Sequence, residues 1–205
     1  MDRRTFTPEV MMMDTNTTID RFLAAQSELG QLVEQVGDQE WQSPTPCSSW
    51  SVHDLVNHLV GEQLWATPML DGETIEQVGS RLDGDLLGDD RIAAWRSAAK
   101  ESASAFGAPG ALDRTINSSM GPSPASQYLA EMTCDLILHR WDLGQAITVE
   151  QRFSSDELEQ VQAMAEALAP NAEQLVSAGI FAAAKPVAAD ADRQSKLLAA
   201  VGRVG

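Results

Sequence analysis

The chain has 205 residues, of which 43% are hydrophobic and 21% charged, the profile of a globular protein long enough to bury a core. Its formal net charge of −16 repels phosphate backbones and anionic lipid headgroups, so binding to nucleic acid or to a membrane surface is not expected. Aromatic residues are scarce, which favours helices over strands, and two cysteines are too few for a disulfide framework.

The start of the chain predicts a leader followed by a helix. Residues 1–14 carry no regular apolar spacing, and we expect them to be disordered, with a single domain over residues 15–205. From Thr17 onwards apolar residues recur every three or four positions, as on one face of a helix. Thr17 with Asp20 resembles a capping box, and Gly37 predicts the end of this helix.

Two more helices are expected in the next part of the chain. The loop WQSPTPCSSW (41–50) contains two prolines, and Ser51 with Asp54 predicts a capped helix start directly after it. Residues 71–90 are rich in Gly and Asp and predict a mobile connection. The apolar spacing returns over residues 89–106, which predicts the third helix.

The second half predicts a crossover and further helices. The irregular run APGALDRTINSSMGPSP could pair briefly as a strand at residues 113–117. The start SPASQ, with Ser123 as N-cap, predicts a fourth helix that continues to Ile147. Ser154 predicts a shorter helix that ends before Pro170, and the apolar patch LLAAV predicts one short C-terminal helix. We therefore expect an all-α domain.

A metal site is predicted within the run EMTCDLILHRWD of the fourth helix. Asp135 and His139 are four residues apart, about 40° around a helix and about 6 Å along it, so they share one face. A carboxylate and an imidazole on an apolar face are costly unless something pairs with them, and a metal ion suits both. His58 lies among apolar residues of the second helix and completes a set of two histidines and one carboxylate.

Two glutamates lie close to this set in the helical pattern. Glu62 is one turn after His58 and could be a further ligand, an outer partner or a general base. Glu131 is one turn before Asp135 and could be an outer partner of a ligand. The alternatives to a metal site are a hydrogen-bonded core histidine and solvated surface carboxylates.

Two segments of the chain resemble a known family. TPCSSWSVHDLVNHLVG and DLILHRWDLGQAI are similar to the two signature blocks of the mycothiol-dependent maleylpyruvate isomerase N-terminal family, within the DinB-like superfamily. The resemblance implies a four-helix bundle of up-down-down-up type that holds one divalent metal ion, usually zinc or nickel. It also implies that His58, Asp135 and His139 are the ligands of that metal.

The resemblance implies an activity as well. We expect a metal-dependent thiol S-transferase or isomerase that acts on a small electrophilic substrate, with mycothiol or another low-molecular-weight thiol as co-substrate. The isomerase has a Glu where Asp135 stands, and it carries a C-terminal thiol-binding domain for which this chain has no room. We expect a cytoplasmic protein, and a homodimer is left open.

Two other functions are compatible with the same residues. A non-catalytic or stress-related helical bundle would hold the metal in a closed site, with Glu62 as a fourth ligand. An iron-dependent oxygenase is the third alternative, because two histidines and one carboxylate also bind non-haem iron.

Overall fold

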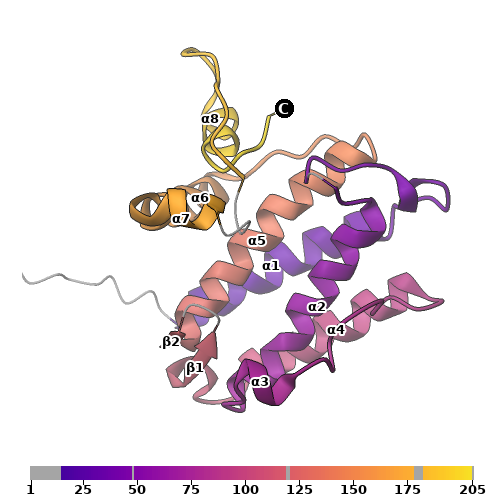
Figure 1. The fold of residues 1–205 in the computed structure, drawn as a ribbon, viewed down its shortest axis with the longest axis vertical. Coiled ribbons are helices and arrows are strands. Elements are labelled where there is room, and N and C mark those ends of the chain that lie inside the picture. The colour runs from indigo at the N-terminus through magenta and orange to yellow at the C-terminus, as the bar shows by residue number, and fades with distance from the viewer. Residues whose placement is uncertain (1–14, 48, 119–120, 178–181, 205) are drawn as a thin grey trace, which may run out of the picture.

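The computed structural model describes residues 15–47, 49–118, 121–177 and 182–204 (Figure 1). The predicted leader, residues 1–14, lies outside this part of the chain. The described residues are mostly helical, which confirms the all-α prediction and is consistent with a DinB-like fold. The four long helices are α1 (Thr15–Val33), α2 (Val52–Leu70), α4 (Arg91–Phe106) and α5 (Ala125–Ala146).

The bundle has the expected up-down-down-up order. In Figure 1, α1 and α5 run in one direction, whereas α2 and α4 run in the other. This order requires the chain to return along the bundle between α2 and α4, and residues 71–90, with the short helix α3 (Ile75–Val78), make that return. In consequence α1 packs mainly against the parallel α5, and α2 mainly against the parallel α4.

A buried polar network crosses the centre of the bundle. The amide Nε2 of Gln26 on α1 donates to Oε1 of Gln63 on α2 at 2.8 Å and to Oγ of Ser102 on α4 at 3.0 Å. The Ser102 hydroxyl also lies 2.6 Å from Oε1 of Gln63. All three side chains are buried, so the network fixes the register of three helices.

Two of the expected helix starts are present as capping boxes. Ser51 Oγ accepts from the backbone N–H of Asp54, whose carboxylate accepts from the backbone N–H of Ser51 at 2.9 Å. Ser154 and Glu157 form the same reciprocal pair at the start of α6 (Ser155–Leu168). Both helices therefore begin where the sequence predicts.

The two other predicted starts are wrong. Thr17 is not an N-cap, because α1 already begins at Thr15. Ser123 pairs with Ile116 in a small antiparallel hairpin of β1 (Thr115–Ser118) and β2 (Gly121–Pro124). That pairing keeps Ser123 extended, so the N-cap and the start of α5 lie one residue later than predicted, with Pro124 as the N-cap and no side-chain cap.

The remaining elements lie outside the four-helix bundle. α6 packs against α5, and α8 (Arg193–Ala200) packs against α6. The other elements are short: η1 (Glu40–Gln42), η2 (Ala111–Asp113), η3 (Ala169–Asn171) and α7 (Ala172–Ser177). Among the helices of the described residues, none has the length and apolar character needed to cross a bilayer.

Candidate metal centre

His58, Asp135 and His139 come together between α2 and α5. Nε2 of His58 lies 3.4 Å from Oδ2 of Asp135, and Nε2 of His139 lies 3.3 Å from Oδ1 of the same carboxylate. One ligand atom from each residue can be chosen so that all three lie within 4.8 Å of one another. Because α2 and α5 are antiparallel neighbours, residues far apart in sequence meet at one level of the bundle.

These separations suit a bound metal ion. Ligand atoms about 2.0–2.1 Å from a tetrahedral zinc lie about 3.3–3.4 Å from each other, which is close to the two separations seen here. Oδ2 of Asp135 is buried and has no hydrogen-bond partner within the described residues. Each oxygen of this carboxylate faces one imidazole nitrogen, Oδ2 that of His58 and Oδ1 that of His139, and two imidazoles with one carboxylate are a donor set expected for a divalent cation.

The centre is partly open to solvent at His58 and Asp135. The side chains of His58 and Asp135 are 29% and 37% exposed, whereas that of His139 is 8% exposed. The indole of Trp50, on the loop before α2, covers part of the site, with its ring centroid 4.9 Å from that of His58. An ion held here would keep a side accessible to a small molecule.

The charges of the centre are strongly coupled. Burial alone would raise the pKa of Asp135, but the neighbouring imidazoles of His139 and His58 hold it far below its usual range. Burial alone would lower the pKa of His139, yet Asp135, Asp142 and Cys47 together raise it well above its usual value. The charges around His139 therefore favour a cation at the centre, either a proton on His139 or a metal ion.

Asp142 is the partner of His139 that the sequence analysis missed. Nδ1 of His139 lies 2.9 Å from Oδ2 of Asp142, whose side chain is fully buried. In the neutral imidazole that a metal ion would bind, the carboxylate of Asp142 accepts the proton of Nδ1, which leaves the lone pair of Nε2 free to coordinate. This is the arrangement by which proteins orient ligating imidazoles. The spacing of three residues from His139 on one helix is a signal that could have identified Asp142.

Cys47 and Arg203 also contact Asp142. Sγ of Cys47 donates to Oδ2 of Asp142 at 3.2 Å and lies 3.8 Å from Nδ1 of His139. The guanidinium of Arg203 donates through Nε at 2.9 Å and through Nη2 at 2.7 Å. Cys47, His139 and Asp142 are close enough to form a second cation site, but Arg203 already supplies a positive charge there. The first set is therefore the candidate metal centre.

Glu62 and Glu131, the two glutamates predicted to lie close to the centre, differ in burial and in their contacts. The pKa of Glu62 is raised, first by burial and then by the charge of Asp135, so its half-buried carboxyl lies near the centre. Glu131 is exposed and accepts a hydrogen bond from Gln127 at 2.9 Å. The predicted outer-partner position next to His139 is taken by Asp142 rather than by Glu131.

Comparison with known proteins places the fold and the centre in a family. The model of the mycothiol maleylpyruvate isomerase N-terminal domain matches residues 22–144. The chain belongs to this family. The match includes α2, all but the last two residues of α5, and all three residues of the candidate centre. Membership suggests a mycothiol-related, metal-binding function of DinB-like type.

The curated relatives of this family member have no assigned activity. Two uncharacterised proteins of Mycobacterium tuberculosis, from two strains, are each 31% identical to it over 126 residues. The aligned region covers 60% of this chain and 63% of each relative, so the chain spans less than two thirds of the length of the relatives it matches. No solved structure matches the chain.

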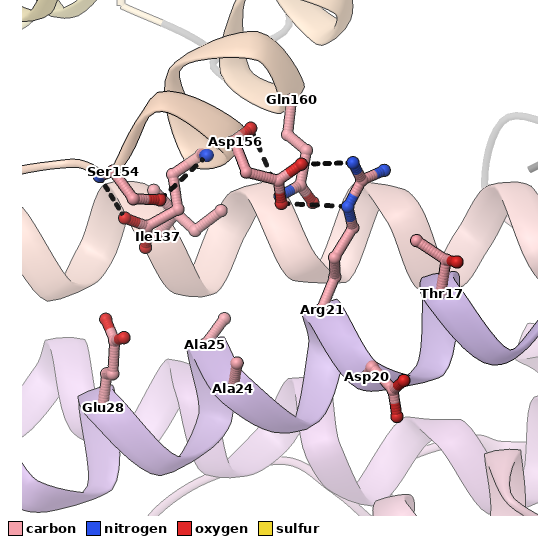
Figure 2. Close-up of a pocket in the computed structure, with 11 residues that line it drawn as sticks. Thr17, Asp20, Arg21, Ala24, Ala25, Glu28, Ile137, Ser154, Asp156 and Gln160 are labelled. Atoms are coloured by element: carbon pink, nitrogen blue, oxygen red, sulfur yellow. Dashed lines mark hydrogen bonds and ion pairs between the residues drawn. The ribbon is translucent and has the colours of Figure 1, made fainter.

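This member of the mycothiol maleylpyruvate isomerase N-terminal domain family also has a pocket of about 370 Å³ between α1, α5 and α6 (Figure 2). Ile137 lines it, and this residue is about 200° around α5 from Asp135, so the pocket lies on the opposite side of the helix. Figure 2 shows Arg21 reaching from α1 to Asp156 on α6, where Nε donates at 2.9 Å. The pocket is thus spanned by an ion pair that joins α6 to the bundle.

Proposed function

We propose that this protein binds one divalent metal ion, zinc or nickel, through His58, Asp135 and His139. The observation that carries the proposal is the carboxylate of Asp135, whose two oxygens lie 3.4 Å and 3.3 Å from Nε2 of His58 and of His139, close to the spacing of tetrahedral ligands, and whose buried Oδ2 has no hydrogen-bond partner among the described residues. A metal ion bound there would lower the pKa of a thiol and hold it as a thiolate. The family to which the chain belongs supports a low-molecular-weight thiol, mycothiol first, as that co-substrate.

The proposed reaction is S-transfer or isomerisation on a small electrophilic molecule. The exposed sides of His58 and Asp135 give the thiol and the electrophile a common entrance. The indole of Trp50 provides an apolar wall beside this entrance. Glu62 is the candidate proton acceptor, because its raised pKa makes it a stronger base than a solvated glutamate.

Metal analysis tests the site. We expect protein purified without added metal to contain about one equivalent of zinc or nickel, and His58→Ala and His139→Ala to contain far less. His53→Ala is the matched control, because His53 is on the same helix but pairs with Asp85 instead. Equal metal content in all four proteins would contradict the proposal.

A panel of thiols tests the co-substrate. Mycothiol, bacillithiol, glutathione and cysteine are added to the zinc-loaded protein, and thermal unfolding is followed. A thiol that binds the folded protein at 100 times its Kd adds about 2.7 kcal/mol to the free energy of unfolding. We expect mycothiol to raise Tm in the zinc-loaded protein and not in the metal-free protein. No shift with any thiol would favour the alternative, a non-catalytic metal-binding bundle.

A further inference from the structure

Arg203, in the segment that follows α8, binds Asp142 beside the candidate metal centre. Its Nε lies 2.9 Å and 3.0 Å from the two oxygens of Asp142, and its Nη2 donates to Oδ2 at 2.7 Å. Its Nη1 donates to the backbone carbonyl of Val201 at 3.3 Å, which fixes the plane of the guanidinium. The side chain of Arg203 is only 13% exposed, so this ion pair is shielded from water.

The turn at the C-terminal end of α8 directs the side chain of Arg203 towards Asp142. Gly202 has φ of +83°, and the backbone N–H of Arg203 donates to the carbonyl of Leu198 at 2.8 Å, as in a Schellman cap. A Cβ on Gly202 would lie 2.5 Å from Cβ of Ala182 and 2.9 Å from its carbonyl oxygen. Only glycine fits this turn, which directs the next residue back onto α5.

The segment 182–204 is itself attached to the bundle at several points. The side chain of Gln194 accepts from the backbone N–H of Phe153 at 2.8 Å and donates to the carbonyl of Gln151 at 2.9 Å. Leu198 and Val201 are buried in the main core. Arg203 is therefore held from a packed element and not from a free end.

We propose that Arg203 is a positioning residue of the metal centre: it holds Asp142, which in turn fixes the ring and the tautomer of His139. The inference rests on the proposed function, because it assumes that His139 binds the metal. Arg203 lies outside residues 22–144, the part that matches the family, so the family match does not assign it this role. Without Arg203, the buried carboxylate of Asp142 would keep, among the described residues, His139 and Cys47 as partners, and its orientation would be less restricted.

The test measures zinc affinity by competition with a chromophoric chelator. Partners of metal ligands are typically worth about 10- to 100-fold in metal affinity, so we expect Arg203→Met to weaken zinc binding about 10-fold or more. Arg203→Lys keeps the charge but not the two parallel hydrogen bonds, and we expect an intermediate loss. The matched control is Arg152→Met, because exposed Arg152 also binds the start of α8, through Asp192, but does not contact Asp142.

Two further measurements separate positioning from a general loss of structure. The visible spectrum of the Co²⁺-substituted protein should change in Arg203→Met, because the geometry at His139 changes, and should stay the same in Arg152→Met. Gly202→Ala should weaken zinc binding as Arg203→Met does, although it leaves every charged group in place. Added guanidinium ion should restore part of the zinc affinity of Arg203→Ala.

The outcomes distinguish this inference from the proposed function. Equal zinc affinity in the wild-type protein and in Arg203→Met would overturn the inference and leave the metal centre intact. A wild-type protein that binds neither zinc nor nickel would overturn the proposed function and, with it, the role of Arg203. Equal weakening by Arg203→Met and Arg152→Met would also overturn the inference, because any loosening of the segment would then have the same effect.

Discussion

Asp135 and Asp142 contact opposite nitrogens of one imidazole, that of His139. Oδ2 of Asp142 lies 2.9 Å from Nδ1, whereas Oδ1 of Asp135 lies 3.3 Å from Nε2 on the side that His58 shares. The two carboxylates therefore have different tasks. Asp142 accepts from Nδ1 and would set the tautomer of the ring, and Asp135 would share a cation bound at Nε2.

The metal-free protein should lose stability as the pH rises. The pKa of His139 is raised in the fold despite burial, because Asp135 and Asp142 stabilise its protonated form. A raised folded-state pKa adds stability that is complete below the unfolded value near 6.5 and is lost as the pH rises through the folded value. Urea unfolding of metal-free protein between about pH 6 and pH 9 measures this loss.

The same proton competes with the metal. Zinc must displace it from Nε2, so zinc affinity should fall as the pH falls below the folded pKa of His139. His139→Asn is the control, because it removes the titrating group, and its unfolding free energy should depend less on pH in this range. A metal-free wild-type protein that becomes more stable from about pH 6 to pH 9 would contradict the assignment of charges.

Glu62→Gln separates an open metal centre from a closed one. The substitution keeps the shape of the side chain but removes a carboxylate whose pKa is raised by burial and by Asp135. If Glu62 accepts a proton, kcat for S-transfer should fall about 10²- to 10⁴-fold while zinc affinity changes little. A large loss of zinc affinity would show instead that Glu62 is a fourth ligand, as expected for a non-catalytic site.

The two cysteines should differ in reactivity. The thiol of Cys134 is buried in α5, and burial raises its pKa to about 12, so almost none of it is thiolate at neutral pH. Cys47 is half-buried, on the loop before α2. Timed iodoacetamide labelling followed by peptide mass spectrometry should therefore modify Cys47 first. In urea, Cys47 and Cys134 should be labelled at equal rates. Equal rates in the folded protein would contradict the buried placement of Cys134.

Ser102→Ala should destabilise the bundle. The buried hydroxyl of Ser102 contacts Gln26 and Gln63, and its removal leaves the two buried amides with fewer partners. We expect a loss of about 1–3 kcal/mol in the free energy of unfolding, measured in urea. Ser104→Ala is the control, because this exposed hydroxyl donates to the carbonyl of Lys100 in its own helix at 2.9 Å, and the variant should stay within about 0.5 kcal/mol of wild type.

The proximity of the three proposed ligands could be predicted because it depends on helical spacing. Asp135 and His139 share a face by spacing alone, and His58 was identified by its apolar neighbours on the second helix. Asp142 follows the same helical rule and was missed, although its three-residue spacing from His139 was visible. Arg203 could not be predicted, because it lies 61 residues from Asp142 and the contact depends on how α8 packs.

The helix boundaries likewise include some that local sequence predicts and one that a tertiary contact determines. The capping boxes at Ser51 and Ser154 are made of local hydrogen bonds, and the sequence predicts both. Ser123 looks like an N-cap in sequence, but its backbone pairs with Ile116 across the hairpin. A tertiary partner thus decided where α5 begins, and no local pattern contains that information.

The pairing of the bundle helices has a consequence for the metal. Since α1 packs mainly on α5 and α2 mainly on α4, the bundle consists of two halves, and neither half contains all three proposed ligands. His58 belongs to one half, and Asp135 and His139 belong to the other. A bound ion would therefore cross-link the halves, and any separation of α2 from α5 by about 1 Å would break the coordination, since ligand distances are set within about 0.2 Å. Metal occupancy would then report directly on whether the bundle is closed.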